Sequence, residues 1–172
     1  MEVIEIAKKA IKGDDEAFLQ IMHLYKDTLY RTAFAFLKTE HEAVEAMQEV
    51  TFRAYQKIRT VKEPSYMKTW LVRIMINYCQ DQLKKSKRAS SSETLPEIGF
   101  SEDTTHLEIN EAIASLSSSE QQLIFLKYFQ NTKIKEIAEL EKIPEGTVKS
   151  RLHKALKSLR NFLSEKGDAD HV

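Results

Sequence analysis

Apolar side chains recur every three or four residues along most of this chain, and strand-like alternation is almost absent. That spacing gathers the apolar residues on one face of a helix. Gly and Pro, the residues that interrupt helices, number only four and three, and they separate long segments of helix-forming residues. The pattern predicts an all-α protein.

Four helices are expected in the first half of the chain. Gly13 ends the first, and the carboxylate of Asp14 can cap the second. Thr39 and Glu42 have the spacing of a capping box at the start of the third. The first helix is expected at about residues 2–12 and the fourth from 65 or 66 to 85, while the second and third begin at their caps and carry apolar stripes over 18–33 and 43–58.

The composition changes after the fourth helix. Residues 89–111 contain six acidic residues and no Lys or Arg, and Ser, Thr, Pro and Gly dominate their first half. Such a segment is typical of a flexible acidic linker. We therefore expect two small helical domains, with a first domain at 1–88, a linker at 89–106, a second domain at 107–166 and a tail at 167–172. Helices in the second domain are expected at about 107–115, 118–130, 133–141 and 145–164.

The overall charge excludes a general bias toward nucleic acid. Lys and Arg number 26, as do Asp and Glu, so any basic surface must be local. The single cysteine, Cys79, excludes an internal disulfide and suits a reducing compartment. No apolar run approaches 18 residues and the N-terminus is acidic, so we expect a cytoplasmic protein with neither a membrane span nor a signal peptide.

The sequence offers no pattern typical of an active site. Its five histidines lack metal-ligand spacing, and no Gly-rich phosphate loop is present. The acidic residues 14–16 are better explained as a helix N-terminus than as a metal site. We expect no enzymatic activity, no metal, no cofactor and no small-molecule substrate.

Residues 132–160, "TKIKEIAELEKIPEGTVKSRLHKALKSLR", have the pattern of a helix-turn-helix. Along the second helix, apolar residues such as Val148 and Leu152 cluster on one side. Residues 145–160 hold five Lys and Arg and one Glu, and the Pro-Gly start leaves backbone N–H groups for phosphate. A solvated surface helix would explain the charge alone, but the two features together favour DNA binding. The side opposite the apolar residues carries Lys149, Ser150, His153, Lys154 and Lys157, with Arg151 at its boundary.

This segment resembles the C-terminal promoter-reading domain of the extracytoplasmic-function sigma factors. The resemblance rests on Glu-Ile-Ala at 136–138, a short turn, and Gly-Thr-Val-Lys-Ser-Arg-Leu at 146–152. The family usually has Gly in the turn where this chain has Lys142, so the turn is expected to be strained or differently shaped. The resemblance implies that the −35 element is read in the major groove by Thr147, Lys149, Ser150, Arg151, His153, Lys154 and Lys157.

The first half resembles the domain of the same family that binds RNA polymerase and opens the promoter. The segment "AVEAMQEVTFRAYQKI", residues 43–58, is similar to the polymerase-clamp helix. Gln48 and Glu49 match the family, whereas Glu45 stands where Asp is usual. The resemblance implies polymerase contacts at these three positions.

The segment "TWLVRIMINYCQDQLKKSKR", residues 69–88, resembles the helix of the family that contacts the −10 element. Melting requires a base to be unstacked and held, which aromatic, amide and cationic side chains can do. The resemblance implies a flipped-base pocket formed by Asn77 and the loop Val61–Tyr66. Trp70 could equally be a core aromatic. The implied −10 contacts are Val61, Tyr66, Trp70, Arg73, Asn77, Lys84, Lys85 and Arg88.

Two functions from different classes follow. The favoured one is an alternative sigma factor of an envelope or extracytoplasmic stress response, with core RNA polymerase, promoter DNA and a membrane-anchored anti-sigma factor as partners. The alternative is a stand-alone helix-turn-helix regulator. The basic, aromatic-bearing stretch 59–88 favours the sigma factor, since a simple repressor does not need it.

Overall fold

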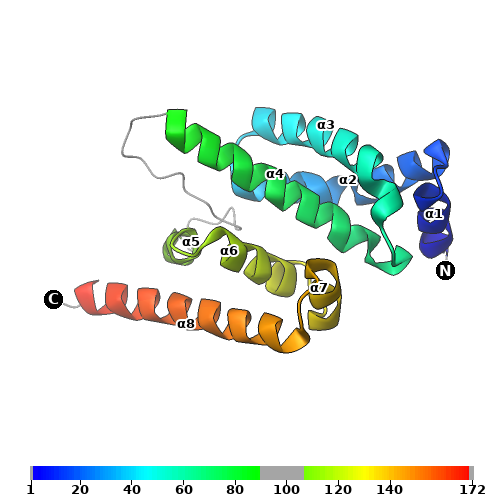
Figure 1. Ribbon diagram of the computed structural model, residues 1–172. Coiled ribbons are helices and arrows are strands. Elements are labelled where there is room, and N and C mark those ends of the chain that lie inside the picture. Colours follow the sequence, from blue (N-terminus) through cyan, green and yellow to red (C-terminus); the bar gives the residue numbers. More distant parts are fainter. Residues whose placement is uncertain (1, 90–106, 171–172) are drawn as a thin grey trace. The chain divides into compact units, whose positions relative to one another are not determined.

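The computed structural model describes residues 2–89 and 107–170, and within them side chains at 2–89 and 109–165. The chain divides into two compact units, Met1–Glu93 and Thr94–Val172. All regular structure in the described ranges is helical (Figure 1), which confirms the predicted all-α fold in two helical parts. The expected linker lies outside the described residues except for Ala89, and its predicted flexibility and the exact domain limits stay predictions.

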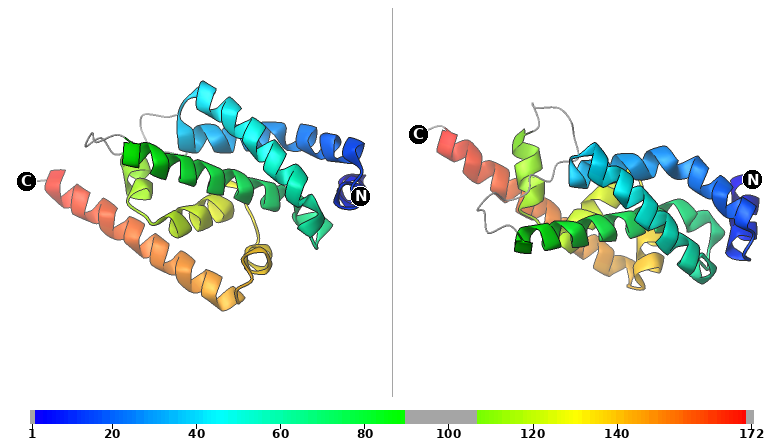
Figure 2. Two further views of the ribbon diagram at one scale, coloured as in Figure 1. Left: turned by 45° about the horizontal axis from the view of Figure 1, so that its top comes forward. Right: turned by 90° about the horizontal axis from the view of Figure 1, so that it is seen from above.

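Unit 1 is built around α2, which packs against α1, α3 and α4. Figure 2 shows these helices from two further sides, with α1 across one end. The fully buried core includes Ile21, Leu29 and Phe36 from α2 and Leu71 from α4. In chain order the elements are α1 (Glu2–Ile11), α2 (Asp15–Leu37), α3 (Glu40–Lys57), η1 (Ile58–Thr60), η2 (Pro64–Tyr66) and α4 (Met67–Ala89).

The predicted helix starts in unit 1 are confirmed by their caps. The N–H of Ala17 donates to Oδ1 of Asp14 at 3.0 Å. At the start of α3, the N–H of Glu42 donates to Oγ1 of Thr39 at 3.2 Å, and the Thr39 hydroxyl donates to the Glu42 carboxylate at 2.9 Å. Each cap satisfies a backbone group that the first helical turn would leave unpaired.

Gly13 makes the turn between α1 and α2 with a φ of 104°. A Cβ at this position would lie 2.6 Å from Nη2 of Arg59, which is closer than atoms can pack. The positive φ favours glycine at this position, whereas the Arg59 guanidinium, at the end of an exposed and flexible side chain, could move aside for a Cβ.

Unit 2 is built around α8, which packs against α5, α6 and α7. Leu126, Ile137 and Val148 are its largest fully buried side chains. The Gln121 amide is also buried, and it donates to the carbonyls of Ile113 at 3.1 Å and Leu116 at 3.3 Å. The elements are α5 (Leu107–Ala114), α6 (Ser118–Ile124), η4 (Phe125–Phe129), α7 (Ile134–Glu141) and α8 (Glu145–Asp170).

Two helices of unit 2 differ from their predicted form. The expected helix at 118–130 ends in a π turn, η4, where the N–H of Gln130 donates to the Phe125 carbonyl at 3.1 Å. Asn131 then takes a left-handed φ of 56°. The other difference is length, because α8 runs through Gly167 as far as Asp170 and the expected tail is helical to that residue.

Candidate nucleic-acid interface

The helix-turn-helix of unit 2 consists of α7, a tight turn and the start of α8. Lys142 ends α7 with φ 57° and ψ 44°, the left-handed conformation. The N–H of the next residue, Ile143, donates to the Ala138 carbonyl at 3.1 Å. A residue with a side chain in this conformation costs about 1–2 kcal/mol. Of the two outcomes expected for this turn, the structure shows the strained one.

The packing between α7 and α8 sets which face of α8 is free. Ile137, Val148 and Ala155 are fully buried, and Ala138 and Leu152 are about 5% exposed. The apolar residues Leu140 and Ile143, which flank the turn, are only half-buried. Since the apolar residues of α8 recur at helical spacing, one side of this helix is held against the unit and the opposite side faces solvent.

That opposite side carries most of the predicted −35 contacts, with Arg151 at its boundary. Thr147 is half-buried in the first turn of α8, and the other six candidates are exposed: Lys149, Ser150, Arg151, His153, Lys154 and Lys157. The structure therefore brings these side chains together on one helix. A helix with this cationic face is suited to the major groove, which admits an α-helix and presents base edges to its side chains.

The predicted −10 contacts lie along α4 and the turn before it. Tyr66, Trp70, Arg73 and Asn77 follow one another at intervals of four, three and four residues. At 100° per residue these positions form one stripe, opposite the core-facing residues of α4. The stripe continues seven residues further, at Lys84.

Exposure along this stripe rises from the start of α4 to its end. Tyr66, Trp70 and Arg73 are half-buried, and Asn77 is exposed. Trp70 is half-buried, so its ring can both pack on the core and present a face to a base. The cations at the end of the helix are all exposed: Lys84, Lys85 and Arg88.

Val61 differs from the other −10 candidates because its side chain is 7% exposed and packs in unit 1. Its N–H donates to the Ile58 carbonyl at 3.1 Å. A buried apolar side chain has no surface to offer a base, so a contact at this position would have to use the backbone or the residues that Val61 supports.

The predicted polymerase contacts lie on α3. Glu45 and Gln48 are exposed, whereas Glu49 is half-buried and accepts a hydrogen bond from Nε of Arg53 at 3.1 Å. The Arg53 guanidinium also lies 5.2 Å from the centre of the Tyr78 ring. Glu49 is thus tied to α4 through Arg53, in addition to any contact with a partner.

Sequence reasoning missed an exposed apolar stripe on the same helix. Val44 is 46% exposed, Phe52 57% and Tyr55 51%. With Gln48 these residues stand at intervals of four, four and three, which places them on one face of α3. The signal was available in the sequence, since these large apolar residues fall outside the core stripe of α3.

Tyr55 is oriented by α2. Its hydroxyl donates to Oδ1 of Asp15 at 2.9 Å, and this hydrogen bond together with the carboxylate charge raises the pKa of Tyr55. Its ring also packs edge-on against Phe18, with the ring centres 5.2 Å apart. The exposed aromatic is therefore held in a fixed position, as an anchor residue at an interface requires.

The remaining reactive groups do not form a chemical site. Burial raises the pKa of the Cys79 thiol to about 12, so the nucleophilic thiolate is scarce at neutral pH. Within the described ranges, no group of three or more His, Cys, Asp or Glu residues could hold a metal ion. In the same part of the chain, no helix combines the length and apolar character needed to cross a membrane.

Two family models match the chain. The model for sigma-70 region 2 matches residues 21–89, which contain most of α2 and all of α3 and α4. The model for sigma-70 region 4 matches residues 106–159, which begin just before α5 and extend into α8.

Similar proteins match over nearly the whole length. The ECF RNA polymerase sigma factor SigW of Bacillus subtilis is 30% identical, over 92% of this chain and 95% of SigW. The RNA polymerase sigma factor SigV of the same organism is 31% identical, over 82% of this chain and 87% of SigV.

Two solved structures share the fold. CnrH, in complex with the cytosolic domain of CnrY, has a TM-score of 0.66 at 18% identity and matches 95% of this chain and 97% of CnrH. The sigma factor RpoE, in complex with the anti-sigma factor NepR from Bartonella quintana, has a TM-score of 0.61 at 23% identity. That match covers 86% of this chain and 96% of RpoE.

Proposed function

This chain belongs to the extracytoplasmic-function (ECF) sigma factors of the sigma-70 family, and we propose that its two units read the two elements of one promoter. It is an alternative sigma factor, which directs core RNA polymerase to its own set of promoters. The proposal assigns the −10 element to unit 1 and the −35 element to unit 2.

The observation that carries the proposal is the exposed cationic face of α8. Lys149, Lys154 and Lys157 lie opposite the buried Val148 and Leu152, so the helix can enter the major groove without leaving its own unit. Phosphate contacts by Lys and Arg position the helix, and Ser150 and His153 can reach base edges between them.

The stripe on α4 supports melting of the −10 element. Its half-buried aromatic residues, Tyr66 and Trp70, offer ring faces to unstacked bases, and Asn77 offers an amide to a base edge. The cations at 84–88 suit the phosphates of a separated strand. A duplex-reading helix would not need this combination.

The exposed face of α3 is assigned to the polymerase. Val44, Phe52 and Tyr55 offer apolar and aromatic anchors, and the polar Gln48 and Glu45 lie beside them. Aromatic anchors surrounded by polar residues are typical of protein interfaces. A protein surface is the better assignment than DNA because this helix face also carries carboxylates.

Run-off transcription with core polymerase on promoter fragments tests the proposal. We expect specific transcripts only when the protein and the core enzyme are both present. The matched variant is Phe52→Glu, which places a charge in the centre of the α3 face and should abolish transcription while leaving binding of unit 2 to −35 DNA intact. Specific transcription by Phe52→Glu at the level of the unchanged protein would contradict the α3 assignment.

The alternative raised by the sequence, a stand-alone helix-turn-helix regulator, is opposed by the family matches in both units. Such a protein would bind its operator tightly without polymerase. The binding of promoter duplex is therefore measured with and without core enzyme. Tight sequence-specific binding by the protein alone, unaffected by core enzyme, would favour the regulator.

We further propose control by an anti-sigma factor in the response to envelope or other extracytoplasmic stress. The fold is shared with RpoE, whose solved complex contains the anti-sigma factor NepR. The protein would act in the cytoplasm, held near the membrane by an anchored inhibitor that covers the α3 face and the cationic face of α8. Such an inhibitor and the polymerase would compete.

Co-purification from unstressed cells, followed by addition of excess core polymerase, tests this control. We expect a membrane protein to be recovered and then displaced by the polymerase. Recovery of no such partner, or a partner whose binding is indifferent to polymerase, would contradict it.

A further inference from the structure

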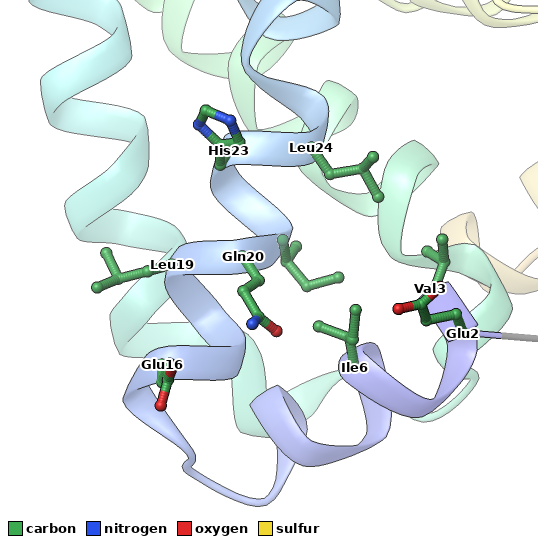
Figure 3. Close-up of a pocket in the computed structure, with 9 residues that line it drawn as sticks. Glu2, Val3, Ile6, Glu16, Leu19, Gln20, His23 and Leu24 are labelled. Atoms are coloured by element: carbon green, nitrogen blue, oxygen red, sulfur yellow. The ribbon is translucent and has the colours of Figure 1, made fainter.

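A groove lies between α1 and α2 on unit 1, and no role proposed so far uses it. Its volume is about 500 Å³. Figure 3 shows Val3 and Ile6 on α1 pointing toward the side chains of α2, with Leu24 on the far side of the groove. None of the residues that line it is a candidate for DNA or polymerase contact.

The lining of this groove is apolar and open to solvent. Val3 is 38% exposed, Leu24 50% and Leu19 64%. Exposed apolar residues are ordinary when scattered, but several around one groove with a polar rim mark an interaction site. The groove is therefore suited to a ligand or partner rather than to water.

The charge of the rim narrows the choice of partner. Glu2 and Glu16 line the groove, and neither forms a salt bridge within the described part of the chain. Among the described residues that line it, none is Lys or Arg. Two unpaired carboxylates repel DNA and anionic lipid and attract a cationic partner.

The shape of the groove favours a helix. Two helices that meet along one side leave a trough into which the ridge of a third helix can pack. A helix would place apolar side chains at i, i+3 or i+4 and i+7 in the trough and polar side chains over its rims. A flat lipid surface would not reach Ile6, which lines the groove and is only partly exposed.

We propose that the α1–α2 groove binds a basic amphipathic helix of a partner protein. Its apolar residues would lie between Ile6 and Leu24, and its Lys or Arg residues would face Glu2 and Glu16. This surface is separate from the residues assigned to promoter and polymerase, so the proposal goes beyond the sigma-factor function and stands without it.

Three fluorescent 18-residue peptides serve as probes, titrated with the full chain and followed by fluorescence anisotropy. The first has leucines at the spacing of one helix face and lysines elsewhere, the second has glutamates in place of the lysines, and the third has the first composition with scattered leucines. We expect the first to bind at least tenfold more tightly than the other two.

Two sets of variants place the binding in the groove. Leu24→Glu should lose binding of the lysine probe, whereas Leu163→Glu, an exposed leucine of α8, should keep it. Glu2→Gln with Glu16→Gln should weaken binding about fivefold, since exposed ion pairs contribute roughly 0.2–1 kcal/mol each. The matched control, Asp27→Asn with Glu40→Gln, removes two exposed charges outside the groove and should have no effect.

The proposal is overturned if the three probes bind alike, or if Leu24→Glu binds the lysine probe as tightly as the unchanged protein. If Leu24→Glu unfolds at the same temperature as the unchanged protein, its loss of probe binding does not come from a loss of fold. Glu2→Gln with Glu16→Gln tests the groove without altering any apolar residue. Sedimentation that shows a dimer dissociated by Leu24→Glu, with no probe binding, would assign the groove to a second copy instead.

Discussion

The two helices assigned to DNA, α4 and α8, present their candidate residues in different ways. On α8 six of the seven candidates are exposed, five on the side opposite the core and Arg151 at its boundary. On α4 and the turn before it, the candidates run from half-buried Tyr66 and Trp70 to exposed Lys84 and Lys85. The candidates on α8 are thus almost evenly exposed, whereas the exposure of those on α4 increases toward its C-terminal end.

This difference follows from the form of DNA that each helix is proposed to meet. A closed duplex presents its base edges in a groove of regular shape, so a protruding helix with exposed side chains is sufficient. A flipped base must be enclosed, and residues that enclose it are themselves partly enclosed by the fold. Half-burial at Tyr66 and Trp70 is therefore consistent with a pocket.

The largest expected effect separates the two faces of α8. Val148→Asp places an unpaired charge where the side chain is fully buried, and it should destabilise unit 2 by about 3–5 kcal/mol. Ser150→Asp, two residues away and exposed, should change stability by less than about 0.5 kcal/mol. Urea unfolding followed by circular dichroism measures both. Equal losses would mean that the face assignment of α8 is wrong.

The next effect concerns readout by α8. Lys154→Ala should weaken binding to the −35 element by about 1–3 kcal/mol, because a well-placed contact to a base or a phosphate is lost. Transcription from promoters altered only in this element is the measurement. Lys9→Ala removes the same charge from α1 and serves as control. Unchanged activity and preference in Lys154→Ala would contradict the face assignment.

A smaller effect is expected at Asn77 on α4. Asn77→Ala should reduce melting of the −10 element roughly fivefold to tenfold, since one hydrogen-bonding group to a base is worth about 1 kcal/mol. Permanganate reactivity of the separated strand reports melting, with polymerase binding as the parallel measurement. Gln82→Ala on the same helix is the control. Normal melting by folded Asn77→Ala would show that this amide is structural.

The smallest effect tests the turn before α8. Lys142→Gly relieves the left-handed strain but raises the entropy of the unfolded chain, so unit 2 should gain at most about 1 kcal/mol. Lys142→Ala keeps the Cβ and should be close to neutral. Thermal unfolding distinguishes them. A loss of stability in Lys142→Gly would mean that the lysine side chain stabilises the turn.

The helices, the caps of α2 and α3 and the cationic face of α8 could be predicted from the order of residues alone. These features depend on residues close together along the chain: the carboxylate of Asp14 bonds three residues ahead, and Val148, Leu152 and Ala155 repeat at helical spacing. Local geometry is the same in every helix, so pattern alone is sufficient. Once the apolar stripe of α8 was identified, its polar face could be placed on the opposite side of the helix.

Which residues of unit 1 are accessible depends on how its helices pack together. Val61 is buried and Phe52 is exposed, although their side chains are equally apolar, because burial depends on which distant helices pack there. The π turn at Phe125–Phe129 and the groove between α1 and α2 likewise arise where separate segments meet. Contacts between residues far apart along the chain carry no short-range signal, so neither the burial of Val61 nor this groove could be placed before the fold was known.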